Sequence, residues 1–99
     1  MIPLSLAKAQ LNIVDNSDDA LIKQYIAAAQ EHIEATLQLK IVDEEVLADG
    51  QISPNAALKS AALIFVSYMY ENRGDGTKQN PDLPEAFYNL IQRYRLMGV

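Results

Sequence analysis

The feature that most constrains this chain is a stretch of ten residues with almost no polar side chains. From Ala61 to Tyr70, every residue except Ser67 is apolar or aromatic. A helix that is apolar around nearly its whole circumference is normally surrounded by protein. A transmembrane helix needs about 20 apolar residues, so this stretch is too short to cross a bilayer. It predicts the central helix of a small soluble domain.

Three further helices are predicted around this one. The first covers about residues 4–12, and the second, about residues 18–38, begins at Ser17 or Asp18 as N-cap. Its apolar residues recur at steps of three and four and form one stripe, namely Ile22, Ile26, Ala29, Ile33 and Leu37. The last helix opens at Pro84 and places four apolar or aromatic residues on one face, namely Phe87, Leu90, Ile91 and Tyr94.

The central helix is expected to start at Ser53 as N-cap, with Pro54 in the first helical position. Its end is expected near Arg73, with Gly74 as the capping glycine and an exposed loop over residues 75–81. In residues 39–53, the pairs 41–42 and 51–52 fit either a small hairpin or a loop. The predicted fold class is all-α: one small four-helix domain over residues 1–99, with a nearly all-apolar third helix.

Composition narrows the classes of function. The 99 residues contain no cysteine, which excludes disulfides and thiolate metal sites. The formal net charge of −5 argues against tight non-specific binding to nucleic acid, which requires a basic surface. The N-terminus lacks the basic and apolar regions of a signal peptide, so we expect a protein made in the cytoplasm.

The charge is distributed unevenly along the chain. Residues 1–72 carry four basic and ten acidic side chains, whereas residues 73–99 carry four basic and three acidic ones. The basic residues of the second group are Arg73, Lys78, Arg93 and Arg95. This asymmetry fits either a partner-facing end or an ordinary solvated surface.

No group of residues predicts catalysis, a cofactor or a metal site. His32 is the only histidine and lies beside the apolar stripe of the second predicted helix, as a structural histidine would. The acidic residues 43–45 are consecutive and do not have calcium-loop spacing. The segment 74–78, GDGTK, lacks the spacing and the preceding strand of a phosphate-binding loop.

The central helix carries more apolar surface than three short partner helices are expected to cover. Monomers rarely leave a large contiguous apolar area exposed. Two explanations remain open at this point: a neighbouring subunit covers part of the helix, or the domain closes over it unaided.

Three blocks of the chain resemble the small head–tail connector (adaptor) proteins of tailed bacteriophages and prophages. The first block consists of LSLAKAQL at 4–11, DDALI at 18–22 and AAAQEHIE at 27–34. The second consists of Pro54, ALKSAAL at 57–63 and YENR at 70–73. The third is the closing segment from Pro84 to Tyr94 and Arg95. These blocks match the family's leading helix and alanine-rich second helix, its central apolar helix, and its last helix. Residues 39–53 match nothing in the family's pattern.

The resemblance implies a structural subunit of a homo-oligomeric ring at the head–tail junction of a virion, assembled in the host cytoplasm. The implied partners are other copies of the chain, the portal protein, and a downstream neck, stopper or tail protein. DNA would pass through the ring without sequence-specific binding, and a net acidic subunit suits such a channel because like charges repel phosphate.

The residues expected to contact a neighbouring subunit or the portal are large aromatic and basic ones, namely Phe65, Tyr68, Tyr70, Arg73, Tyr88, Arg93, Tyr94 and Arg95. By the family's pattern, the helix end with Arg93 and Arg95 would approach the portal. The alternative interpretation is a monomeric helical module whose apolar groove binds a partner helix.

Overall fold

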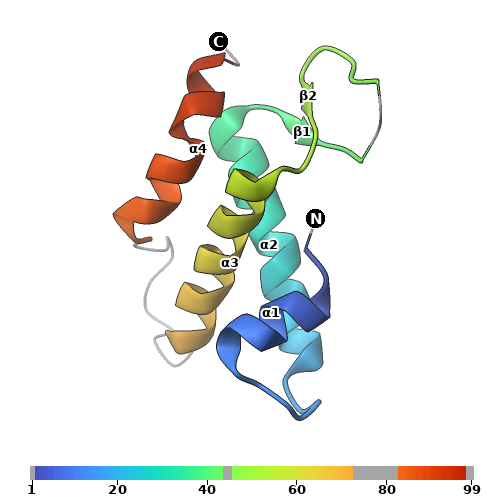
Figure 1. The fold of residues 1–99 in the computed structure, drawn as a ribbon, viewed down its shortest axis with the longest axis vertical. Coiled ribbons are helices and arrows are strands. Elements are labelled where there is room, and N and C mark those ends of the chain that lie inside the picture. Colours follow the sequence, from blue (N-terminus) through green and yellow to red (C-terminus); the bar gives the residue numbers. More distant parts are fainter. Residues whose placement is uncertain (1, 44–45, 73–82, 98–99) are drawn as a thin grey trace.

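The computed structural model describes residues 2–43, 46–72 and 83–97, without the side chains of Arg93 and residues 95–97. The elements are α1 (Leu4–Leu11), α2 (Asp19–Leu37), β1 (Lys40–Ile41), β2 (Gln51–Ile52), α3 (Ala56–Glu71) and α4 (Glu85–Met97). In Figure 1, α2 and α3 cross in the middle of the molecule, α4 lies along one edge, and α1 lies at the opposite end from the strands. The predicted four-helix, all-α fold is confirmed.

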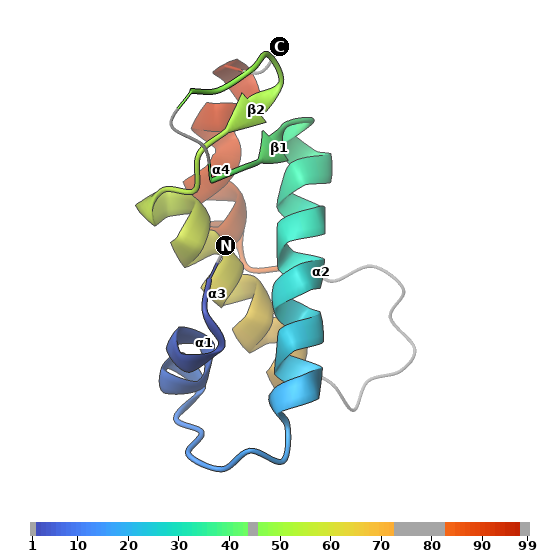
Figure 2. The same cartoon turned by 90° about the vertical axis from the view of Figure 1, so that its right-hand side faces the viewer.

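The core forms where the apolar stripe of α2 meets α3. Four of the five predicted stripe residues are buried, and Ile26 is half-buried. Helix α4 adds Phe87 and Ile91, which are 0% and 1% exposed, on the face that the sequence predicts. Figure 2 shows α3 between α1 and α4 with α2 alongside, which explains why α3 needs apolar side chains in several directions.

Helix α3 is covered more completely than its composition suggests. Its buried side chains are Leu58, Ala61, Ala62, Phe65 and Val66. The other residues of 61–70 are half-buried, and none of them is exposed. The large apolar side chains that are exposed in the described part of the chain lie on other elements, namely Leu6, Val14, Val46, Leu47 and Tyr88. The domain therefore closes over α3 largely unaided.

The boundaries of α3 differ from those predicted. The N-cap is Asn55, whose Oδ1 accepts a hydrogen bond of 3.0 Å from the backbone N–H of Leu58. The prediction of Ser53 as N-cap is wrong because β2 runs through Ile52 and holds the chain extended before the helix can start. The helix ends at Glu71, two residues before the predicted end. The predicted cap at Gly74 and the predicted loop at 75–81 lie outside the described residues.

The two short strands pair in parallel, so the predicted hairpin alternative is wrong. Lys40 lies opposite Gln51 and Ile41 opposite Ile52, with the backbone N–H of Lys40 donating to the carbonyl of Gly50 at 2.8 Å. Parallel strands require the chain to return to its starting end before it pairs. Residues 42–50 make this return, and Gly50, with φ of +81°, adopts the left-handed conformation that it needs.

Candidate protein-interaction surfaces

The five predicted contact residues whose side chains the structure describes lie at four separate locations. Phe65 is only 3% exposed and belongs to the core. Its ring lies 5.4 Å from that of His32 and 6.2 Å from that of Phe87, between centroids. Phe65 therefore stabilises the domain itself, and its prediction as a surface contact is not supported by its position.

Tyr68 and Tyr70 lie near the C-terminal end of α3. Both are half-buried. The hydroxyl of Tyr70 donates a hydrogen bond of 2.6 Å to Asp18, the residue that precedes α2. The carbonyl of Tyr68 accepts from both the backbone and the side-chain N–H groups of Asn72, which ends the helix. Both side chains also pack against the core, so each tyrosine has a role inside the subunit.

Tyr88 lies on the outer side of α4 and is 42% exposed. Its ring stands edge-on to Phe87, with centroids 5.1 Å apart and an angle of 88° between the planes. Beside it is a hollow of about 130 Å³, lined by Thr36, Tyr88, Ile91 and Gln92. We call it the Tyr88 hollow. It presents aromatic and apolar surface between α4 and the last turns of α2.

Tyr94 lines a larger groove at the end of the molecule that carries the strands. This groove, of about 470 Å³, runs along residues 47–52 and the end of α2, and its apolar lining consists of Leu39, Leu47, Ala48, Ile52 and Tyr94. Gln38, Leu39 and Gly50 are shared with an adjoining cavity of about 410 Å³. We call the first cavity the Tyr94 groove.

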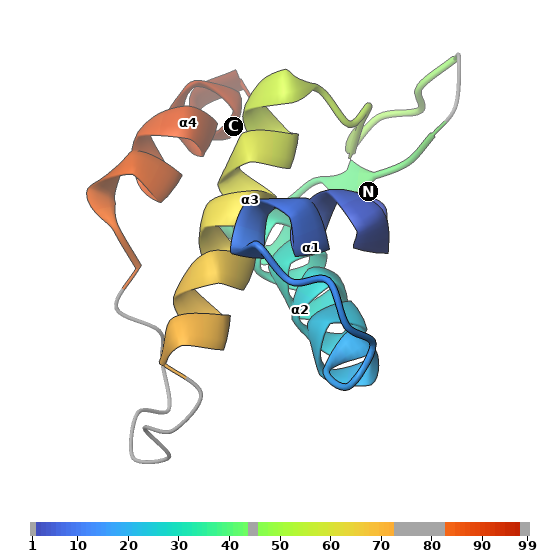
Figure 3. The ribbon, with the colours of Figure 1, turned by 60° about the horizontal axis from the view of Figure 1, so that its bottom comes forward.

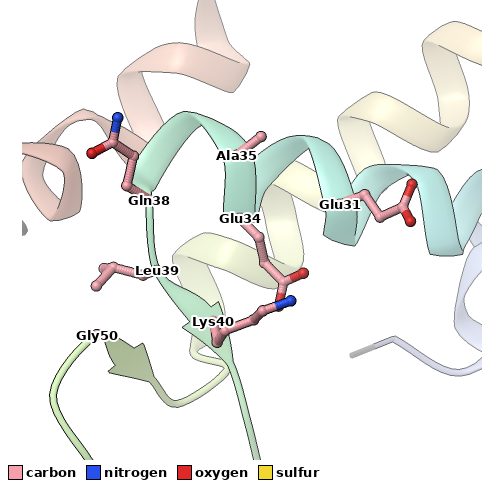
Figure 4. Close-up of a pocket in the computed structure, with 7 residues that line it drawn as sticks. All are labelled: Glu31, Glu34, Ala35, Gln38, Leu39, Lys40 and Gly50. Carbon is pink, nitrogen blue, oxygen red and sulfur yellow. The ribbon is translucent and has the colours of Figure 1, made fainter.

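The adjoining cavity is polar on the side formed by α2. Figure 4 shows Glu31 and Glu34 on this helix, with the Lys40 side chain extending toward the Glu34 carboxylate. Glu34 also accepts a hydrogen bond of 2.8 Å from the backbone N–H of Ile41, which attaches β1 to α2. This bond positions the strands, and with them one wall of the Tyr94 groove.

The described part of the 42–50 loop carries an apolar tip that the sequence analysis did not single out. Val46 is 86% exposed and Leu47 is 41% exposed. The acidic residues Asp43 and Asp49 on either side of this tip are also exposed. In the sequence this tip is visible only as two apolar residues within an acidic segment, and composition alone does not show that they are exposed.

The other three predicted contact residues are the arginines, whose side chains the structure does not describe. Arg73 lies outside the described residues, and the side chains of Arg93 and Arg95 are not described.

His32 lies in an aromatic cluster with Phe65 and Phe87. Its ring is 5.4 Å from Phe65 and 5.6 Å from Phe87, and its Nε2 has no hydrogen-bond partner among the described residues. Burial lowers the pKa of His32 below its usual value because the charged form would lose its hydration. In the described part of the chain there is no group of three histidine or acidic residues that could hold a metal ion, and no helix there is long and apolar enough to cross a membrane.

Comparison with known proteins identifies one family. The model of the family described as "Phage gp6-like head-tail connector protein" matches residues 1–95. No curated protein and no solved structure matches the chain significantly. The family match covers α1, α2 and α3, the segment 39–53, and α4 as far as Arg95.

Proposed function

The chain belongs to the phage gp6-like head-tail connector family, and from this membership we propose that it is a subunit of a ring that docks on the portal. The ring extends the DNA channel from the portal toward the tail and receives the next neck or tail component. The observation that carries this proposal is the family match over residues 1–95. The site of action is then the head–tail junction of the virion, and the work of the subunit is assembly.

The distribution of apolar surface supports an assembling subunit. The Tyr94 groove and the exposed apolar side chains of Val46, Leu47 and Tyr88 lie outside the core that the helices share. Because the core is closed, binding at these surfaces would require no rearrangement of the four helices. The net charge of −5 suits a protein that surrounds moving DNA, since acidic surface repels phosphate.

We assign portal docking to the Tyr94 groove. It lies at one end of the elongated molecule, which measures 39 × 29 × 18 Å. Its apolar lining and the adjacent polar groups of Gln38, Asp49 and Gln51 match a common pattern for protein binding, an apolar centre with a polar rim. Arg93 and Arg95 flank Tyr94 in the sequence, and we propose that this end of α4 approaches the portal.

Electron microscopy of the purified protein, alone and mixed with portal particles, tests the proposed function. We expect an additional ring density at one end of each portal. Subunits that remain monomeric and never bind the portal would contradict the proposal. The variant Tyr94→Ala should lose portal binding, whereas Val14→Asp, at an exposed valine in the turn between α1 and α2, should retain it. Melting curves of both variants establish that they remain folded.

The groove also supports a second function, a monomeric module that binds a helix of a partner protein. The same experiment separates the two functions. A groove-binding monomer would bind partner protein as single copies and would show no ring, whereas a connector subunit places several copies around one portal.

A further inference from the structure

Two apolar features that portal docking does not use lie on opposite sides of the molecule. One is Val46 at the tip of the 42–50 loop, whose neighbour Leu47 lines the Tyr94 groove, and the other is the Tyr88 hollow on α4. In Figure 1 the loop projects at the upper right and α4 lies along the left edge. Figure 3, seen from another direction, again separates α4 from the loop, with α3 between them.

The two features also lie at the same end of the long axis. The loop follows β1, which begins three residues after the end of α2. The Tyr88 hollow includes Thr36, the second-to-last residue of α2. A contact between the tip of one copy and the hollow of the next therefore joins two points at the same level of the long axis. Neighbouring copies are then related mainly by rotation, with little translation along this axis. Repeated contacts of this kind close into a ring.

The charges of the two elements are complementary. The loop residues 42–50 include four acidic side chains and no basic one, whereas residues 85–97 of α4 include two arginines and one glutamate. Opposite charges across a contact favour the correct orientation and the encounter of the two surfaces. A contact between two loops would instead place acidic residues against each other, which favours the head-to-tail arrangement over a symmetric one.

The size of the hollow suits a small aliphatic side chain. It measures about 130 Å³, comparable to the ~150 Å³ apolar cavity that holds one benzene molecule in an engineered protein. Val46 presents an aliphatic side chain that is 86% exposed and has no cover within the described part of its own subunit. Burying this side chain against Tyr88 and Ile91, which line the hollow together with Thr36 and Gln92, removes it from water, and this is the main favourable contribution to association.

We propose that the 42–50 loop of one subunit docks on α4 of the next, with Val46 in the hollow beside Tyr88. This contact deepens the proposed connector function and rests on it. Every subunit offers one tip and one hollow, so each copy binds two neighbours through different surfaces. The segment 39–53, which separates the two halves of the helical domain in the sequence, then serves as the arm that joins neighbouring subunits.

The absence of cysteine from the chain allows a direct test by crosslinking. The double variant Val46→Cys, Gln92→Cys places one thiol on the tip and one at the exposed edge of the hollow. Portal-bound protein is oxidised mildly and separated on a non-reducing denaturing gel. Because a disulfide requires Cβ atoms about 3.5–4.5 Å apart, we expect a ladder of covalent multimers. The matched control, Val14→Cys with Gln92→Cys, should remain monomeric on the gel.

Single-cysteine variants test the direction of the contact. Val46→Cys alone and Gln92→Cys alone should not crosslink, whereas an equal mixture of the two should yield covalent dimers and nothing larger. Crosslinking of Val46→Cys to itself would reveal a symmetric contact and overturn the proposal. A double variant that assembles on the portal yet crosslinks no more than the Val14 control would also overturn it.

These results separate the two proposals. If the wild-type chain does not assemble, alone or on the portal, the proposed connector function fails, and the contact between subunits fails with it. If the wild-type chain assembles and the crosslinks are absent, only the docking of the loop on α4 fails.

Discussion

Replacing Tyr70 by phenylalanine tests the hydrogen bond that connects the end of α3 to the start of α2. The Tyr70 hydroxyl donates to a carboxylate oxygen of Asp18 at 2.6 Å and joins residues 52 positions apart in the sequence. This length is typical of a charge-assisted O–H···O⁻ bond. Asp18 is the N-cap of α2, yet its side chain makes no capping bond to that helix. The hydroxyl therefore holds the start of α2 against the end of α3.

The expected loss follows from the type of bond and its exposure. Hydrogen bonds to charged groups contribute about 1.5–3 kcal/mol to stability. Both side chains are half-buried, so the lower value applies. We expect Tyr70→Phe to reduce the free energy of unfolding by about 1.5 kcal/mol. For a domain of this size, such a loss lowers the melting temperature by about 6–12 °C.

Urea and thermal unfolding, followed by circular dichroism, would measure this loss in a double-mutant cycle with Asp18→Ala. The coupling energy between the two positions should account for most of the effect of Tyr70→Phe. A coupling energy below about 0.3 kcal/mol, the range in which independent mutations add, would refute the reasoning. Tyr88→Phe serves as the matched control because Tyr88 is exposed, and it should change stability by less than about 0.5 kcal/mol.

Three further predictions concern the core, a helix cap and pH. Phe87→Ala removes a fully buried ring that contacts Phe65, His32 and Tyr88; it should cost about 3–5 kcal/mol, measured by urea unfolding. Asn55→Ala removes the capping bond to Leu58 and should cost about 1 kcal/mol, whereas Asn55→Asp, which retains the acceptor, should cost much less. Burial lowers the pKa of His32 in the folded state, so below about pH 6.5 the unfolded chain binds more protons than the folded one. Stability should therefore fall from pH 7 to pH 5, and a His32→Leu variant should lose that slope; an unchanged slope would contradict the lowered pKa of His32 in the folded state.

The sequence by itself determined the number, order and type of the helices. The apolar stripe of α2 and the face of α4 with Phe87 and Ile91 could be read from helical spacing because burial selects apolar side chains at that period. The exclusion of disulfides and thiolate metal sites could also be read, since the chain contains no cysteine. The family resemblance rested on the same packing residues, and the match over residues 1–95 confirms it.

Only the tertiary structure decided which residues remain available to partners. Phe65 and Tyr88 are both aromatic residues on amphipathic helices, yet one is 3% exposed and the other 42%. Likewise, the pairing of 40–41 with 51–52 depends on contacts between residues eleven positions apart, which no local pattern specifies. The parallel pairing makes residues 42–50 the connection that returns the chain between the two strands, because the chain must turn back before it pairs. Local sequence selects helices through hydrogen bonds four residues apart, whereas exposure and loop position depend on how distant segments pack together.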